Sequence, residues 1–187
     1  MKLSLLSLLL GLGIGLPQIY GLARPAALAQ ALREFPRSLT WGYLLMPLGT
    51  AWFLWNLRSD QISDFDAFKP ILFAGFAIIG IGTCVFVRDF LAVRGLAVVV
   101  LLLAKLVLDS ARWVDTEWRL VLAVGAYLWI VLAVWFTISP WRLRDLIGFL
   151  TVNETRVRLF CALRLGLALL LIGLGLTVFR QACGGFY

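Results

Sequence analysis

The sequence contains no histidine. That absence excludes histidine general bases, histidine metal ligands and histidine-ligated haem, which are common in membrane redox subunits. The three cysteines, Cys84, Cys161 and Cys183, form no CxxC pair, and two of them fall inside predicted helices. Such spacing is not that of a disulfide scaffold or a structural zinc site. We therefore predict no cofactor and no metal site.

Catalytic signatures are missing as well. The sequence has no HExxH, no GxSxG, no P-loop and no glycine-rich dinucleotide fingerprint. Charged residues make up only 14% of the chain, whereas about a quarter is usual in soluble domains. The net charge is +7, but the basic residues are scattered between apolar runs instead of clustering on one face. A nucleic-acid partner is therefore not predicted.

Long apolar runs dominate what is present. Hydrophobic residues account for 62% of the 187 residues, and six stretches are apolar throughout most of their length. Each approaches or exceeds the roughly 20 residues that a transmembrane helix needs. The six predicted spans are residues 3–23, 39–57, 70–87, 90–108, 120–139 and 159–179. The sequence thus predicts an all-α integral membrane protein, a six-transmembrane-helix bundle forming a single domain over residues 1–187.

The first span has a second interpretation. Met1-Lys2, a leucine-rich run and the downstream Ala27-Leu28-Ala29 together resemble a secretory signal with a small-residue cleavage site. The segment between Pro17 and Ala29 is long for a cleavage region, however, and it contains Arg24. We expect an uncleaved helix, and cleavage within residues 1–29 is the alternative.

Segments 25–35 and 140–150 each begin with proline and carry their apolar residues on one helical face. This pattern predicts two short amphipathic helices lying in the membrane interface. They serve either as caps of helical hairpins or as docking elements for lipid or a partner. The order of span, proline-led helix, arginine and span recurs at both ends of the chain. Parallel hairpin repeats would explain that recurrence, and chance similarity between leucine-rich helices is the other explanation.

Lysine and arginine in short loops set the orientation of a membrane protein. Six spans put both termini on one side, which we call side A, and the opposite side is side B. Side B receives ten arginines, and side A receives seven lysines and arginines. This bias predicts that side B is cytoplasmic, with both termini non-cytoplasmic, in a plasma or inner membrane.

One set of ionisable residues falls on a single face of the fourth predicted span. Lys105, Asp109 and Arg112 follow one another at steps of four and three residues, so Lys105 and Asp109 are predicted to pair. A snorkelling lysine with a structural partner is one interpretation. A path for protons or substrate is the other, since charges inside a membrane are costly.

Arg164 is the second intramembrane charge. Only residues 165–179 separate it from Arg180, a rise of about 22 Å against a hydrocarbon core of about 30 Å. We expect a carboxylate partner from Asp89, Asp145 or Glu154, and an anion-binding site is the alternative. A further hypothesis gathers Arg164 with Arg142, Arg144 and Asp145 around a cytoplasmic-side pocket.

Small residues at helical spacing predict where helices approach closely. They are Ser4, Ser7, Gly11 and Gly15 in the first span, and Ala162, Gly166 and Gly173 in the last. A cluster of acidic residues, Asp60, Asp64 and Asp66, falls in the outer loop. It is expected to be a solvated loop, with weak cation binding as the alternative.

These features leave three functional hypotheses. The leading one is a non-enzymatic structural or accessory subunit of a membrane assembly. Its partners would be membrane lipid and either other membrane subunits or further copies of itself in a homo-oligomer. The second is a small transporter or channel, based on the repeat, the prolines inside two spans and the Lys105–Asp109–Arg112 face. The third is a lipid-modifying membrane enzyme using the interfacial arginines and Asp145.

Overall fold

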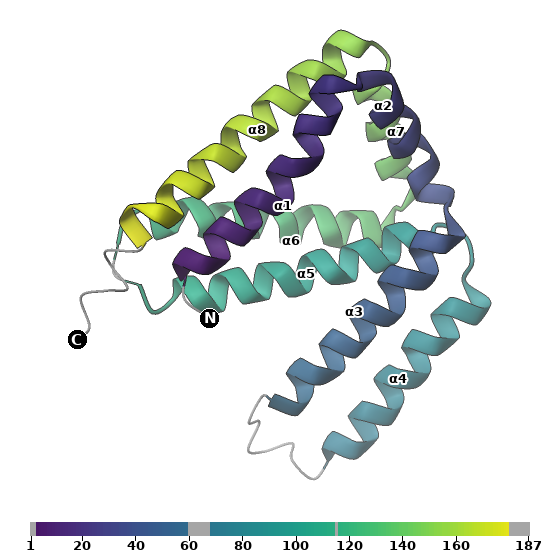
Figure 1. Cartoon of the computed structure of the whole chain (residues 1–187). Coiled ribbons are helices and arrows are strands. Elements are labelled where there is room, and N and C mark those ends of the chain that lie inside the picture. The colour runs from purple at the N-terminus through teal and green to yellow at the C-terminus, as the bar shows by residue number, and fades with distance from the viewer. Residues whose placement is uncertain (1–2, 60–67, 115, 180–187) are drawn as a thin grey trace. The chain divides into compact units, whose positions relative to one another are not determined.

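The computed structural model describes residues 3–59, 68–114 and 116–179. Over these residues the chain is all-helical, with eight α-helices and no strand (Figure 1). The helices are α1 (Leu3–Ala23), α2 (Pro25–Glu34), α3 (Leu39–Ser59), α4 (Lys69–Phe86), α5 (Leu91–Ala111), α6 (Arg119–Ile138), α7 (Trp141–Leu150) and α8 (Glu154–Leu176). A 3-10 turn, η1 (Phe35–Arg37), follows α2. The predicted all-α class is confirmed.

Most helix positions agree with the prediction. The bounds of α1 match the first predicted span, and α2 and α7 occupy the two proline-led segments. The last helix differs, because α8 begins at Glu154, five residues before the predicted start of the span. Glu154 in the first turn favours a helix start, and its carboxylate lies 3.9 Å from the guanidinium of Arg158. The helix therefore extends through the charged turn that precedes the predicted span.

Five helices, α1, α4, α5, α6 and α8, are long and apolar enough to cross a membrane. They support a multi-pass membrane protein. At the second predicted span, α3 is 21 residues long but is not among these five, and polar residues such as Asn56 and Arg58 lie near its end.

The chain divides into two compact units. The first comprises Met1–Arg33, Ala104–Leu128 and Asp145–Tyr187, and the second comprises Glu34–Leu103 and Trp129–Arg144. The prediction of a single domain over residues 1–187 stays a prediction.

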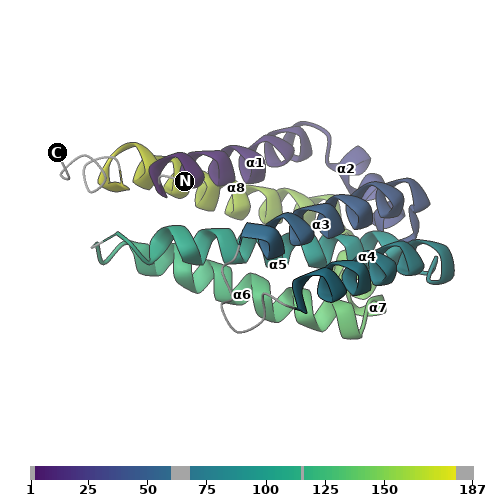
Figure 2. The same cartoon turned by 90° about the horizontal axis from the view of Figure 1, so that it is seen from below.

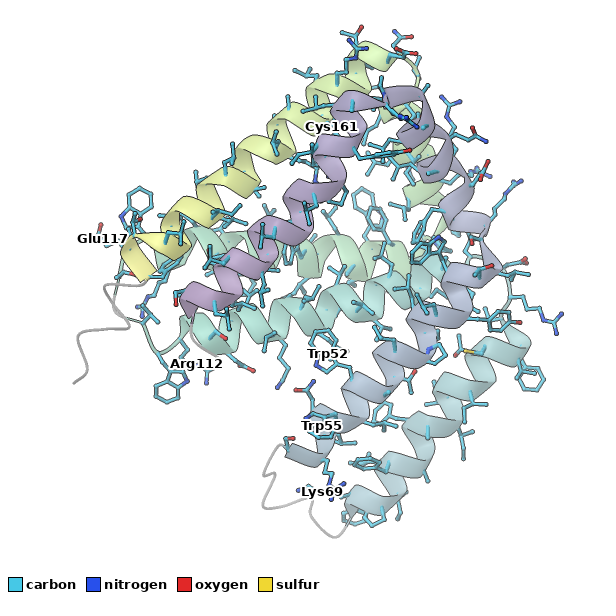
Figure 3. All side chains as sticks on the ribbon, viewed as in Figure 1. Trp52, Trp55, Lys69, Arg112, Glu117 and Cys161 are labelled. Carbon is cyan, nitrogen blue, oxygen red and sulfur yellow. The ribbon has the colours of Figure 1, made fainter. Side chains whose placement is uncertain are left out.

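In the first unit α1 packs along α8 with the opposite chain direction (Figures 1 and 2). Near the start of α1, a Cβ added at Gly175 would lie 3.1 Å from the carbonyl oxygen of Ser4. At the other end of α1, a Cβ at Gly21 would lie 2.7 Å from Cys161 Sγ, and Cys161 lies between the two helices (Figure 3). The pairing of one helix's beginning with the other's end makes α1 and α8 antiparallel.

The α1 face of this interface was predicted correctly. Ser7 is buried, and its hydroxyl donates a 2.6 Å hydrogen bond to the carbonyl oxygen of Leu171. A Cβ added at Gly11 would lie 2.9 Å from the carbonyl oxygen of Ala168. Glycine and serine therefore let the two backbones approach closely, as small residues do in membrane helix pairs.

The α8 face was predicted wrongly. An added Cβ at Gly166 or Gly173 would meet nothing within 4 Å, and Ala162 is exposed. The small residues of α8 that contact α1 are instead Cys161, Ala168 and Gly175, which are seven residues apart. Small residues occur on two faces of α8, and their spacing alone does not show which face meets α1.

In the second unit α3 lies between two neighbours. It runs antiparallel to α4, where a Cβ at Gly80 would touch Thr50 and the rings of Phe53 and Phe76 meet edge-on at 4.7 Å. It runs parallel to the first part of α5, because a Cβ at Gly42 would meet Leu91 and one at Gly49 would meet Val98. Close packing through glycine therefore also builds this unit.

Candidate functional site

The predicted Lys105–Asp109 pair is confirmed. Lys105 Nζ lies 3.3 Å from the Asp109 carboxylate, and the two side chains are 42% and 52% exposed. Arg112 follows the end of α5 and is also exposed (Figure 3). The pair lies in the last two turns of the helix, where a lysine can snorkel. Its geometry is that of an ordinary i,i+4 helix pair, and a role for Arg112 beside it stays a prediction.

Arg164 contacts a ring. Its guanidinium carbon lies 5.3 Å from the centre of the Phe160 ring, one turn earlier in α8. The side chain thus runs back toward the beginning of α8, the direction in which helical side chains tilt. Glu154, one of the three carboxylates predicted to pair with Arg164, lies beside Arg158 instead. Phe160, an aromatic neighbour at i−4, was not among the partners predicted from the sequence, which were all carboxylates.

The four charged residues predicted to line a cytoplasmic-side pocket do not all belong to the same unit. Arg142 and Arg144 lie in the first turn of α7 and belong to the second unit, whereas Asp145 and Arg164 belong to the first. A pocket formed by these residues therefore stays a prediction.

A feature that the sequence did not reveal joins α2 to the end of α7. Arg33 Nε donates a 2.8 Å hydrogen bond to the hydroxyl of Thr151, and a terminal nitrogen of Arg33 donates to the Thr151 carbonyl oxygen. The Thr151 hydroxyl in turn donates to the carbonyl oxygen of Ile147 at 2.7 Å. Thr151 is buried. No local pattern signals this contact, because its partners are 118 residues apart.

Replacing Arg33 by alanine is expected to lower the free energy of unfolding by about 2 kcal/mol, because the buried Thr151 loses a charged donor. Chemical unfolding of the detergent-solubilised protein measures the change. Arg37→Ala is the matched control, since Arg37 is exposed at the end of η1. Equal stabilities for the two variants would show that the contact does not stabilise the fold.

The remaining predicted site gives no structural result. Asp60, Asp64 and Asp66 lie outside the described residues. Among the residues that the structure describes, no group of three or more acidic, cysteine or histidine side chains is placed to hold a metal ion.

Comparison with known proteins gives no relative. No protein-family model, curated protein or solved structure matches this chain.

Proposed function

We propose that the chain crosses the membrane six times, with α3 as the additional crossing. Successive crossings alternate in direction, so the first and last are antiparallel only when their number is even. The antiparallel packing of α1 against α8 supports an even number, whereas α1, α4, α5, α6 and α8 alone would make five. Among the other described helices, α2 and α7 have ten residues each, a rise of about 15 Å. Only α3, with 21 residues and about 31 Å of rise, approaches the required length.

The exposed tryptophans support the same topology. Six tryptophans among the described residues have strongly exposed side chains, and each lies within four residues of a helix end. They are Trp41, Trp55, Trp113, Trp118, Trp135 and Trp141. Tryptophan is enriched where a membrane meets water. Trp41 and Trp55 lie near opposite ends of α3. Their positions therefore favour a helix whose two ends each lie at a membrane–water interface.

In this topology we propose that side B is cytoplasmic and that both termini are non-cytoplasmic. The support is the excess of arginine in the loops of side B. The two ten-residue helices α2 and α7, each following a long apolar helix, would lie at the cytoplasmic interface. Their equal length and similar placement favour the hairpin-repeat hypothesis, which stays a prediction.

We further propose that the protein is a structural or accessory subunit of a membrane assembly. The observation that carries this proposal is the surface of α4. Gly80 is the only buried residue of this 18-residue helix. On the opposite side Gly75 and Gly82 have nothing within 4 Å of an added Cβ, and Ile78 and Ile79 beside them are exposed. Small residues flanked by branched ones form the kind of surface on which another transmembrane helix packs.

Gly82→Ile tests this proposal. The added side chain would fill the Gly75–Gly82 surface, and the variant is expected to separate from its partner, which is a helix of another subunit or of a second copy. Native mass spectrometry of the protein extracted in mild detergent measures the assembly mass. Gly13→Ile is the matched control, because Gly13 is also open and lies in α1. A wild-type protein that runs as a single chain, or a variant that keeps the wild-type mass, would contradict the proposal.

A small transporter or channel is the second candidate. The Lys105–Asp109 pair supports it, since the two groups lie 3.3 Å apart within an apolar helix. Both side chains are about half exposed, however, and exposed i,i+4 pairs of this kind are ordinary structural features. The α4 surface therefore favours the subunit role.

A further inference from the structure

A ridge of alternating arginine and aromatic residues begins α8. Arg156, Phe160 and Arg164 are spaced four residues apart and so follow one line along the helix. Arg164 lies over Phe160, with 5.3 Å between the guanidinium carbon and the ring centre. Arg156 lies over the ring of Phe149 of α7 at 4.8 Å. Each of the two guanidinium groups is thus held against a ring.

The other two arginines with described contacts at this end of the first unit are engaged differently. Arg33 donates to both oxygens of Thr151, and Arg158 lies 3.9 Å from Glu154. A ring, in contrast, accepts charge but leaves most of the five N–H donors of a guanidinium available. Among the described residues, the one acceptor with a hydrogen bond to Arg156 is the Phe149 carbonyl oxygen at 3.5 Å, the limit of a hydrogen bond. Arg156 and Arg164 therefore keep donors for an external anion.

An exposed ridge of leucines runs beside the arginines. Leu159, Leu163 and Leu167 are 70%, 69% and 50% exposed and are also spaced four residues apart. They extend along α8 from the level of Phe160 toward the middle of the helix, over about 12 Å. One leaflet of the hydrocarbon core is about 15 Å deep. The leucine ridge thus covers most of the depth of one leaflet.

We propose that this surface of α7 and α8 binds an anionic phospholipid. Arg156 and Arg164 hold the phosphate by charge-assisted hydrogen bonds, which guanidinium forms bidentately with phosphate oxygens. The acyl chains lie along Leu159, Leu163 and Leu167. The Cα atoms of the two arginines are about 12 Å apart along the helix, and their side chains run toward the rings of Phe149 and Phe160. Basic residues at the cytoplasmic end of membrane helices commonly recognise anionic lipids.

The test uses the full chain in mild detergent, titrated with phosphatidylglycerol, with phosphatidylcholine or with inorganic phosphate, and native mass spectrometry reports the bound fraction. Phosphatidylglycerol is expected to bind about tenfold more tightly than phosphatidylcholine, and Arg156→Ala and Arg164→Ala are each expected to weaken its binding about tenfold. Arg158→Ala is the matched control and should leave binding unchanged. Equal binding of the two lipids, or an equal loss in the control, would overturn the proposal.

Two further variants separate the sources of phosphate and guard against misfolding. Leu163→Gln should weaken phosphatidylglycerol binding and leave inorganic phosphate binding unchanged, since only the lipid contacts the leucine ridge. If inorganic phosphate binds as tightly as the lipid and Leu163→Gln has no effect, the site takes free phosphate and the lipid proposal is wrong. Arg164→Lys keeps the charge and should bind more lipid than Arg164→Ala. Binding that is equally lost in both variants would exclude recognition by charge.

Discussion

Replacing Gly11 by leucine is expected to lower the free energy of unfolding by about 3 kcal/mol, the cost of overpacking a tight contact. A Cβ at this position would lie 2.5 Å from a side-chain carbon of Ile172 and 2.9 Å from the backbone oxygen of Ala168. The side chain of Ile172 can turn, but the Ala168 backbone moves only if α8 shifts away from α1. That shift would also lengthen the hydrogen bond between Ser7 and Leu171.

Gly13→Leu is the control for this prediction. Gly13 lies two residues further along α1, and nothing lies within 4 Å of an added Cβ there. Leucine favours a helix over glycine by somewhat less than about 1 kcal/mol, so this variant should be as stable as the wild type or slightly more stable. Chemical unfolding in mixed micelles compares the two. If both variants unfold at the same denaturant concentration, α1 does not pack closely against α8 at Gly11 and the prediction is contradicted.

Hydrophobic patterning was sufficient to locate the helices. The apolar runs gave the positions of α1, α4, α5 and α6 to within about three residues, because a membrane-spanning segment needs about 20 predominantly apolar residues. The two proline-led helices were found for a different reason. Proline fits the first turn of a helix, and one apolar face then identified α2 and α7.

Contacts between distant parts of the chain were harder to predict. On α1 only one face carries serine and glycine at helical spacing, so Ser7 and Gly11 were identified as packing residues. On α8 two faces carry small residues, and the wrong one was chosen. The hydrogen bonds of Arg33 with Thr151 had no sequence signal, since both residues are common and far apart in the chain. Local patterns show which residues can pack closely but do not show which partner they meet.

For the charged candidate residues, too, some neighbours could be predicted from the sequence and others could not. Lys105 and Asp109 are four residues apart on one helix, so their pairing follows from helix geometry. The neighbour of Arg164 is also four residues away, but it is the ring of Phe160 and not a carboxylate. Because arginine interacts favourably with both groups, a search for opposite charge alone gave an incomplete set of partners.

The central claim is the sixth crossing, and cysteine accessibility in intact cells tests it most directly. Single cysteines are introduced by Ala26→Cys in α2, Ser59→Cys at the end of α3 and Asp89→Cys after α4, in a background with the native cysteines replaced by alanine. All three positions are exposed. The account predicts that a membrane-impermeant maleimide labels only the Ser59→Cys variant from outside, whereas the Ala26→Cys and Asp89→Cys variants react only after the membrane is opened. Labelling that puts residues 26 and 89 on opposite sides would mean that α3 does not cross, and the proposed topology would be wrong.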